Sequence, residues 1–414
     1  MSIFQFSLSF FWGALLAIVL PKMVLDLVGM DLKDTRLGLL LGIGALVGGI
    51  TQIGFGALSD VVGFRWGKRR PYLFVGTILT SLILLAFPYV QSYAALFGLI
   101  IIMQLFINSA IGPYQALMPD IIHPNYHGRG GAVMGMMTLI GRIGGAGGTA
   151  SLLGRENGLL ILFVLFIVLM NVCMLTTLYL VREPRFTGAR KTVGETFAEI
   201  VDVPLKPYRS FTFLLGARFG MYLGFYSVMS FLLYYVKFTL GYPNEDEALI
   251  IIRNFFIIST LLGVVGMVPA GIYSDKLSKK SIMYVANSIC FLSAIGFLLA
   301  GNATQAYFAV AIFGIGFGAF MTVDWALGCN LLPQHSKAKY FGVWNLSDIL
   351  PQTLAPLVAG PVAAFVNSMY PPGGGYKAIM LLAITYFTIG TIILTQITER
   401  KIIKEPESEK VYKS

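Results

Sequence analysis

Four ionisable side chains interrupt long apolar stretches of the sequence. They are Arg142, Arg218, Asp324 and Asp348. A charge is costly to keep among apolar neighbours within a membrane, so each of these residues is a candidate for function. Two carboxylates beside two guanidinium groups could take up and release a proton, and could also contact the polar groups of a small ligand. The alternative is that they form static ion pairs, which only hold their segments together.

Polar and aromatic side chains at similar depth in the apolar stretches extend this candidate site. Amides and aromatic rings suit a small polar ligand because they combine hydrogen-bonding groups with flat apolar faces, although each alone is more often a packing residue. These further candidates are Gln104, Asn108, Trp325, Trp344, Asn345 and Gln352. The sequence has no Ser-His-Asp arrangement, metal-ligand spacing or glycine-rich phosphate loop, so we expect no enzyme activity, cofactor or metal.

The segments that carry these residues have the composition of membrane spans. The chain has 414 residues, of which 56% are hydrophobic and 12% are charged, whereas soluble domains carry about 25% charged residues. Its mean hydropathy is +0.76. Apolar runs of about 20 residues recur along the chain, and a helix of that length crosses the hydrocarbon core. Only helices satisfy the backbone of such runs in lipid, short of a closed barrel.

The apolar runs predict an all-α polytopic membrane protein with twelve transmembrane helices. We expect these helices at 6–29, 37–59, 71–90, 93–119, 131–152, 159–181, 211–236, 249–274, 281–300, 305–332, 340–366 and 376–398. The residues between the sixth and seventh helices are polar. The expected organisation is an N-terminal six-helix bundle over 1–181, a linker over 182–210, a C-terminal six-helix bundle over 211–400 and a tail over 401–414.

Lysine and arginine concentrate on one side of this predicted topology. With the N-terminus inside, most of the 30 lysine and arginine residues fall in the loops, linker and tail on the inner side. Cytoplasmic loops carry this bias, so both termini are expected in the cytoplasm of a cell-membrane protein. The same bias accounts for the net charge of +10 without a nucleic-acid partner. We expect a monomer in contact with the lipid bilayer, a small-molecule solute and H+.

A short motif recurs at the ends of the second and eighth predicted helices. GALSDVVGFRWGKRR and GIYSDKLSKK both place Gly-x-x-Ser-Asp before a basic cluster. Such a repeat predicts two related halves, as in transporters whose halves rock about a central site. Glycine lets helices approach closely, and an acid beside cations can form a contact that breaks during rocking. The candidates for this conformational latch are Gly56, Asp60, Arg69, Arg70, Gly271 and Asp275. The alternative is a basic loop that only sets topology.

The predicted helices, the central linker and the doubled Gly-x-x-x-Asp loop resemble the major facilitator superfamily. The first loop continues to GKRRP at 67–71, and this longer spacing resembles the sucrose transporters and the related glycoside–pentoside–hexuronide cation symporters. GPYQALMPDII, VDWALGCNLLP and GVWNLSDILPQTLAP are similar to the same group and its prokaryotic branch. The second helix lacks the paired acids of the sodium-coupled symporters, which weakens the case for a sodium site.

The resemblance implies a secondary active transporter that works by alternating access. Its expected activity is proton-coupled symport of a sugar or similar small organic solute, with the four charges at the central cavity. A proton-coupled exporter of drugs or metabolites on the same fold stays open, because superfamily exporters often carry glycines in the fifth helix. The glycines around Arg142 are Gly141, Gly144, Gly145, Gly147 and Gly148.

Overall fold

The computed structural model describes residues 2–62, 64, 67–121, 127–181, 183, 208–274, 277–331, 337–370 and 373–398, and these are helical apart from short connections. The helices before the linker are α1 (Ser2–Ala14), a π-helical turn (Leu15–Val19), α2 (Leu20–Val61), α3 (Arg70–Leu84), a 3-10 turn (Phe87–Tyr89), α4 (Tyr93–Ile121), α5 (His127–Leu153) and α6 (Gly158–Leu180). Those after it are α8 (Arg209–Ser230), α9 (Leu232–Tyr234), a second π-helical turn (Tyr235–Thr239), α10 (Glu245–Ser274), α11 (Lys279–Leu299), α12 (Ala303–Leu331), α13 (Lys337–Met369) and α14 (Gly374–Leu394).

The helices account for the twelve expected membrane crossings. Within the described ranges, nine helices are long and apolar enough to cross a membrane, or ten if α8 and the bent segment after it form one span. The first of these covers 58 residues, although one crossing needs only about 20. It reverses at Gly29, whose φ of 70° lies in the left-handed region that glycine adopts readily. It therefore has the length for two crossings. The 27-residue α5 is long enough to be the remaining crossing, although it is not among those nine apolar helices.

The reversal at Gly29 corrects the expected boundary between the first two helices. The sequence predicted a loop over residues 30–36, and this loop is wrong, because the helix resumes directly after the glycine. A single residue with positive φ turns the chain, so no longer connection is needed. Lys33 and Asp34 consequently lie in the first turns of a helix, where their side chains have fixed directions.

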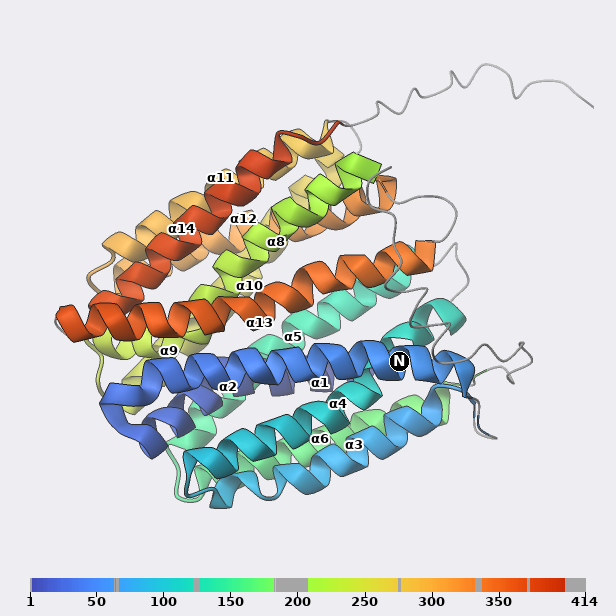
Figure 1. Cartoon of the computed structure of the whole chain (residues 1–414), viewed down its shortest axis with the longest axis horizontal. Helices are drawn as coiled ribbons and strands as arrows, with labels where there is room; N and C mark the ends of the chain where they lie inside the picture. Colours follow the sequence, from blue (N-terminus) through green and yellow to red (C-terminus); the bar gives the residue numbers. More distant parts are fainter. Residues whose placement is uncertain are drawn as a thin grey trace, which may run out of the picture.

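The helices pack as two sets with matching neighbours (Figure 1). In the first set, α1 packs on α5, and α4 contacts both α2 and α3. In the second set, α8 packs on α13, and α12 contacts both α10 and α11. The two sets meet along α2 with α13 and along α5 with α10, which are equivalent pairs if the halves are repeats. The bundle boundaries drawn from the sequence stay a prediction.

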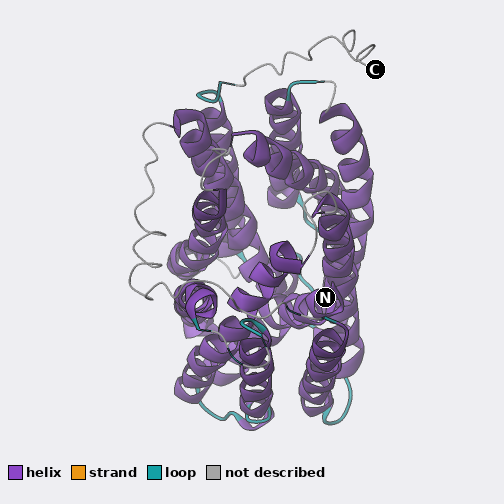
Figure 2. Ribbon diagram, turned by 90° about the vertical axis from the view of Figure 1, so that its right-hand side faces the viewer, coloured by secondary structure: helices purple, strands orange, loops and turns teal. Residues whose placement is uncertain are grey.

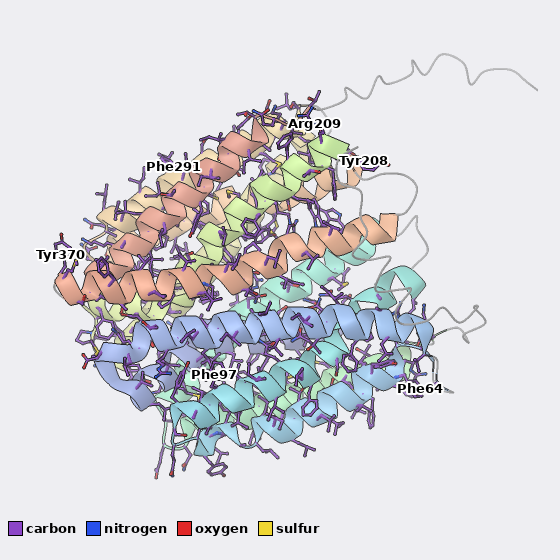
Figure 3. The ribbon with its side chains drawn as sticks, viewed as in Figure 1. Phe64, Phe97, Tyr208, Arg209, Phe291 and Tyr370 are labelled. Carbon is purple, nitrogen blue, oxygen red and sulfur yellow. The ribbon has the colours of Figure 1, made fainter. Side chains whose placement is uncertain are left out.

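The bundle has two ends that the later description refers to. Tyr370 lies at one end, and Phe64, Tyr208 and Arg209 lie at the opposite end (Figure 3). We call them the Tyr370 end and the Arg209 end; Figure 2 is viewed from the Arg209 end. Between the ends, the outer faces of the helices carry exposed large apolar side chains, as lipid contact requires. Examples are Leu175, Val268 and Phe308.

Glycines permit close contact between helix backbones at two places, one between α1 and α5 and one between α2 and α13. A Cβ atom at Gly145 of α5 would lie 2.2 Å from the carbonyl oxygen of Phe10 in α1. A Cβ atom at Gly38 of α2 would lie 2.4 Å from the carbonyl oxygen of Pro356 in α13. No side chain fits either contact, so glycine permits the backbones to touch. The second contact joins the two sets of helices.

Candidate functional site

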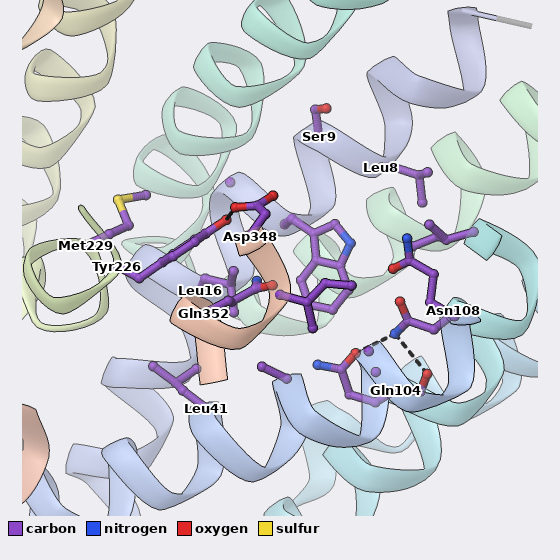
Figure 4. Close-up of a pocket in the computed structure, with 18 of the residues that line it drawn as sticks. Leu8, Ser9, Leu16, Leu41, Gln104, Asn108, Tyr226, Met229, Asp348 and Gln352 are labelled. Atoms are coloured by element: carbon purple, nitrogen blue, oxygen red, sulfur yellow. Dashed lines mark hydrogen bonds between the residues drawn. The ribbon is translucent and has the colours of Figure 1, made fainter. Parts of the chain in front are cut away.

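A cavity of about 310 Å³ lies between the two sets of helices. Its walls come from α1, α2, α4 and α5 of one set and from α8 and α13 of the other. Toward the Arg209 end it extends to Gln5, Gln52 and Gln115. Figure 4 shows part of the lining. Five of the site residues expected from the sequence line this cavity, namely Gln104, Asn108, Arg142, Asp348 and Gln352.

The wall formed by α8 and α13 presents a carboxylate. Asp348 accepts a hydrogen bond from the hydroxyl of Tyr226 at 3.1 Å, and both side chains line the cavity (Figure 4). Gln352 follows Asp348 by four residues, so the two side chains share one face of α13. This wall therefore offers the carboxylate of Asp348, which accepts a hydrogen bond from Tyr226, and the amide of Gln352 one helical turn away.

The opposite wall presents neutral amides. The Nδ2 atom of Asn108 donates to the side-chain oxygen of Gln104 at 2.7 Å (Figure 4), and Gln52 donates to Gln115 at 2.7 Å. A Cβ atom at Gly48 would lie 2.7 Å from the Gln104 oxygen, so the absence of a side chain at position 48 leaves room for the amide pair. Amide groups can both donate and accept, which suits hydroxyl or carbonyl groups of a solute.

The α5 wall presents the cation of the cavity. The side chain of Arg142 is exposed and lines the cavity, and it forms no hydrogen bond or ion pair with any residue that the structure describes. Its backbone is held against α1, because a Cβ atom at Gly13 would lie 3.2 Å from the Arg142 Cα atom. Nearby, Gln5 of α1 donates to Thr138 of α5 at 3.2 Å. The guanidinium thus starts from a well-anchored helix, and its charge acts on Asp348 of the same cavity although the two form no direct ion pair.

The other two membrane charges pair with each other away from the cavity lining. Arg218 of α8 donates to Asp324 of α12, and both side chains are buried. The guanidinium lies over the ring of Trp344, 4.0 Å from its centroid, and near Tyr222 at 4.8 Å. One carboxylate oxygen of Asp324 and the Nε atom of Arg218 have no hydrogen-bond partner. The geometry is an ion pair that joins two helices of one half.

The tryptophans expected at the site do not line the cavity. Trp344 is fully buried beside Arg218, and Trp325 of α12 is 54% exposed with its ring edge-on to that of Trp344. The side chain of Asn345 lies outside the described residues. Helical spacing predicts a shared face but not whether that face points inward, so the sequence alone did not separate these rings from true lining residues.

Of the predicted latch residues, Arg69 and Arg70 have described side-chain contacts, and these lie within the first half of the molecule. Arg69 donates to the carbonyl oxygen of Gly56 at 3.2 Å and to the hydroxyl of Ser59. Arg70 donates to the carbonyl oxygen of Leu178, at the end of α6, at 2.5 Å. Glu183 accepts from the backbone N–H of Arg69 at 3.0 Å. These contacts tie α2, α3 and α6 together. The Asp60 side chain and the whole of Asp275 lie outside the described residues.

The second half repeats part of this arrangement. Ser59 donates to the carbonyl of Gly56 at 2.7 Å, and Ser274 donates to the carbonyl of Gly271 at 2.7 Å. Lys280, in the first turn of α11, donates to backbone carbonyls after α14, as Arg70 does at the end of α6. A cation at a helix C-terminus satisfies carbonyls that the helix leaves unpaired. The sequence motif therefore corresponds to a shared local structure in the two halves.

A cluster around Asp34, at the Tyr370 end, joins the two halves. Its two carboxylate oxygens accept from the Tyr376 hydroxyl at 2.7 Å and from the Asn367 amide at 2.9 Å. Lys33 lies 3.3 Å from the same carboxylate, and its ammonium faces the rings of Tyr234, Phe238 and Tyr376 at 4.9–5.7 Å from their centroids. Lys33 and Asp34 are each only 3% exposed. We call these six residues the Asp34 cluster.

Two further contacts join the halves near the Asp34 cluster. Lys22 lies 2.8 Å from Glu245 and 3.1 Å from Asp26, and the hydroxyl of Tyr234 donates to the Pro21 carbonyl at 2.8 Å. The spacing of Lys22 and Asp26, four residues apart in the first predicted helix, already indicated a local pair at this end. Sequence reasoning missed the Asp34 cluster, since it placed Lys33 in an outer loop. The glycine at position 29 was the one available signal, because a lone glycine between apolar runs can reverse a helix without a loop.

Comparison with known proteins agrees with this fold. The family model of the Major Facilitator Superfamily matches residues 1–356. The chain is 24% identical over 352 residues to an uncharacterized MFS-type transporter of Methanocaldococcus jannaschii, covering 83% of this chain and 82% of that protein. It is 25% identical over 195 residues to the sucrose transport protein SUC3 of Arabidopsis thaliana, covering 38% of this chain and 33% of that protein. The chain thus spans about a third of the plant protein's length.

Solved structures with the same fold include two transporters. A bacterial homolog of the human lysosomal transporter Spinster, in an inward-facing and occupied conformation, superposes with a TM-score of 0.73, 14% identity and 95% and 94% of the two chains covered. A mutant of the nucleoside transporter NupG gives a TM-score of 0.71, 14% identity and 96% and 98% coverage. Fold and cavity define a multi-pass membrane transporter of small solutes, not an enzyme. The chain belongs to the Major Facilitator Superfamily.

Proposed function

We propose that this protein is a proton-coupled secondary active transporter of a small polar organic solute, in the cell membrane with both termini cytoplasmic. The observation that carries the proposal is the cavity between two sets of similarly packed helices, lined by one acid, one cation and several amides. Membrane charges at such a cavity mark solute and proton pathways. A midplane site between repeats is the arrangement that alternating access requires.

The conformation supports a cytoplasm-facing state of this transporter. At the Tyr370 end, α2 and α13 are in backbone contact through Gly38, and the Asp34 cluster bridges the halves. The cavity instead extends to Gln52 and Gln115 toward the Arg209 end, and their mutual hydrogen bond is solvent-exposed. The basic loops favour the cytoplasmic side for the Arg209 end, and the proposal adopts that orientation. The Asp34 cluster is accordingly the outer closure of the solute pathway.

Asp348 is the coupling acid in this proposal. It is the carboxylate that lines the cavity, and its partner Tyr226 can donate to it and release it as the halves move. Asp324 is the weaker candidate, because it is already paired with Arg218. The resemblance of part of the chain to a sucrose transport protein supports a sugar-like solute. The glycine-rich contact of α5 with α1 supports the alternative of a proton-coupled exporter.

Counterflow in proteoliposomes tests the proposal. Purified protein is reconstituted with a saturating unlabelled solute inside, and entry of the labelled solute is followed for sugars, organic acids and amphiphilic drugs in turn. Counterflow of at least one solute supports a transporter, and acceleration by an inward proton gradient supports coupling. Gradient-driven entry identifies an importer, and gradient-driven extrusion identifies the exporter. Counterflow with no response to the gradient or to a protonophore would refute the coupling but not the transport.

A further inference from the structure

We propose that the solute carries an acidic group, a carboxylate or a phosphate, and that this oxyanion binds the guanidinium of Arg142. The inference rests on the proposed transport function and adds the chemical class of the solute. It starts from an asymmetry among the four charges that the sequence predicted at the site. Arg218 has its acid, Asp324, and Asp348 has its donor, Tyr226. Arg142 has no hydrogen-bond or ion-pair partner among the described residues.

We infer that the transported solute supplies the hydrogen-bond and ion-pair partner that Arg142 lacks among the described residues. A guanidinium keeps its charge in proteins, so Arg142 cannot become neutral when its surroundings dry out. In the present conformation its side chain is exposed in a cavity that reaches the Arg209 end, where water can solvate it. Alternating access requires the cavity to close around the solute, which removes that water. A bound oxyanion would then be the counter-ion of Arg142. The closed site would hold the solute only if the solute carried a negative charge to balance the guanidinium.

The geometry of the wall suits an oxyanion. Arginine presents donors in a planar fork that pairs with two oxygens of a carboxylate or phosphate at once. The contact of Gly13 with the Arg142 backbone fixes the position from which the arginine side chain extends. The close α1–α5 contact at Gly145 holds α5 in place. The α4 wall of the same cavity offers the Gln104–Asn108 amide pair, which suits hydroxyl groups on the rest of the solute. A cavity of about 310 Å³ admits a small metabolite of this kind.

Asp348 links the anion to the proton. An ionised carboxylate in the same cavity would repel an acidic solute, whereas a protonated one can donate a hydrogen bond to it. Loading one proton onto Asp348 and one monovalent anion onto Arg142 leaves the cavity neutral in total. Solute and proton would therefore bind together. This is the condition for coupled transport, in which neither the solute nor the proton crosses the membrane alone.

The test uses matched solutes that differ only in the acidic group. The full-length protein, purified and reconstituted, is assayed by counterflow competition with glucose, glucuronate and glucose 6-phosphate, and with glycerol, glycerate and glycerol 3-phosphate. We expect at least one acid to compete more strongly than its neutral counterpart, on the order of tenfold to a hundredfold, the range for a hydrogen bond to a charged group. The carboxylate and phosphate members identify which oxyanion the site prefers.

Two variants assign the preference to its residue. Arg142→Gln should remove the preference for the acid over its neutral counterpart. Arg142→Lys, which keeps the charge without the fork, should retain part of it. Arg155→Gln, an exposed arginine in the connection between α5 and α6, is the matched control and should retain all of it. Monodisperse elution and an unchanged melting temperature in detergent confirm that each variant is folded.

The outcomes separate the acidic-solute inference from the transport proposal. If no acid in the panel competes better than its neutral counterpart, the inference is wrong, and counterflow of a sugar or drug would still leave the transporter standing. If an acid is preferred but Arg142→Gln keeps the preference, the inference is also wrong, because a residue other than Arg142 then binds the acidic group. If the wild-type protein shows no counterflow with any solute class, the proposed function fails, and the inference fails with it.

Discussion

Loss of the Asp34 carboxylate should open the Tyr370 end of the molecule. In the closed conformation Asp34 accepts hydrogen bonds from Tyr376 and Asn367 of the other half and pairs with Lys33, at 3% exposure. Asp34→Asn keeps the shape but removes the charge from all three contacts. Hydrogen bonds to a charged group contribute about 1.5–3 kcal/mol each. When the outer end opens, water solvates the carboxylate and offsets part of that free energy. A net loss of about 2 kcal/mol shifts the closed–open equilibrium about 30-fold.

Thiol labelling measures this shift. A single cysteine replaces Leu40, a buried cavity-lining residue near the Tyr370 end, in a background without other cysteines. Whole cells are treated with a membrane-impermeant thiol reagent, and the labelling rate is compared with and without Asp34→Asn. We expect much faster labelling in the variant. Tyr376→Phe, which removes one hydrogen bond and leaves the acid, should give a smaller increase, about fivefold for a loss of about 1 kcal/mol.

Asp26→Asn provides the control, because it makes the same chemical change at the same end. Asp26 is 57% exposed in its ion pair with Lys22, and such pairs contribute only about 0–1 kcal/mol. The labelling rate should therefore hardly change. Equal rates for wild type, Asp34→Asn and Tyr376→Phe would refute the reasoning, because they would mean that the Asp34 cluster packs the halves without holding them closed. A large effect of Asp26→Asn would show that net charge at this end matters, and not the buried contacts.

The remaining predictions concern coupling, the latch, helix packing and topology. Asp348→Asn should abolish solute accumulation driven by a proton gradient while exchange of labelled for unlabelled solute persists, since exchange moves no net proton; full accumulation in this variant would place the proton site elsewhere. Wild-type accumulation should fall as the pH at the Tyr370 end rises. Asp60→Asn should slow transport without reducing the amount of protein or equilibrium solute binding, and a wild-type rate would leave that loop a purely topogenic role. Gly145→Ala should lower the melting temperature, because the added Cβ would lie 2.2 Å from the Phe10 carbonyl oxygen and overpacking costs about 1–3 kcal/mol; unchanged melting would contradict the close α1–α5 contact. A cysteine at Tyr370 should react with an impermeant reagent outside the cell, and a cysteine at Thr192 should not; the reverse pattern would invert the membrane orientation.

Sequence reasoning predicted the spans and the depth of the charged residues for a clear physical reason. A membrane crossing needs about 20 apolar residues in one continuous run, so each helix is visible without knowing its neighbours. Arg142 and Asp348 could be found in the same way, as charges within such runs. The boundary at residues 30–36 was wrong, because one glycine with positive φ replaced a loop whose length the sequence pattern suggested.

The sequence by itself determined that this chain crosses a membrane many times, which charged residues interrupt the apolar runs, and the superfamily that its loop motifs resemble. Only the tertiary structure decided which charges pair. Arg218 and Asp324 are 106 residues apart, and Asp34 and Tyr376 are 342 apart, so helical periodicity carries no information about these contacts. Once the helices pack, Asp324 is taken by Arg218, Asp34 joins the two halves, and Arg142 faces the cavity without a partner among the described residues. The choice of partner depends on how the helix faces meet, and that is a property of the folded molecule.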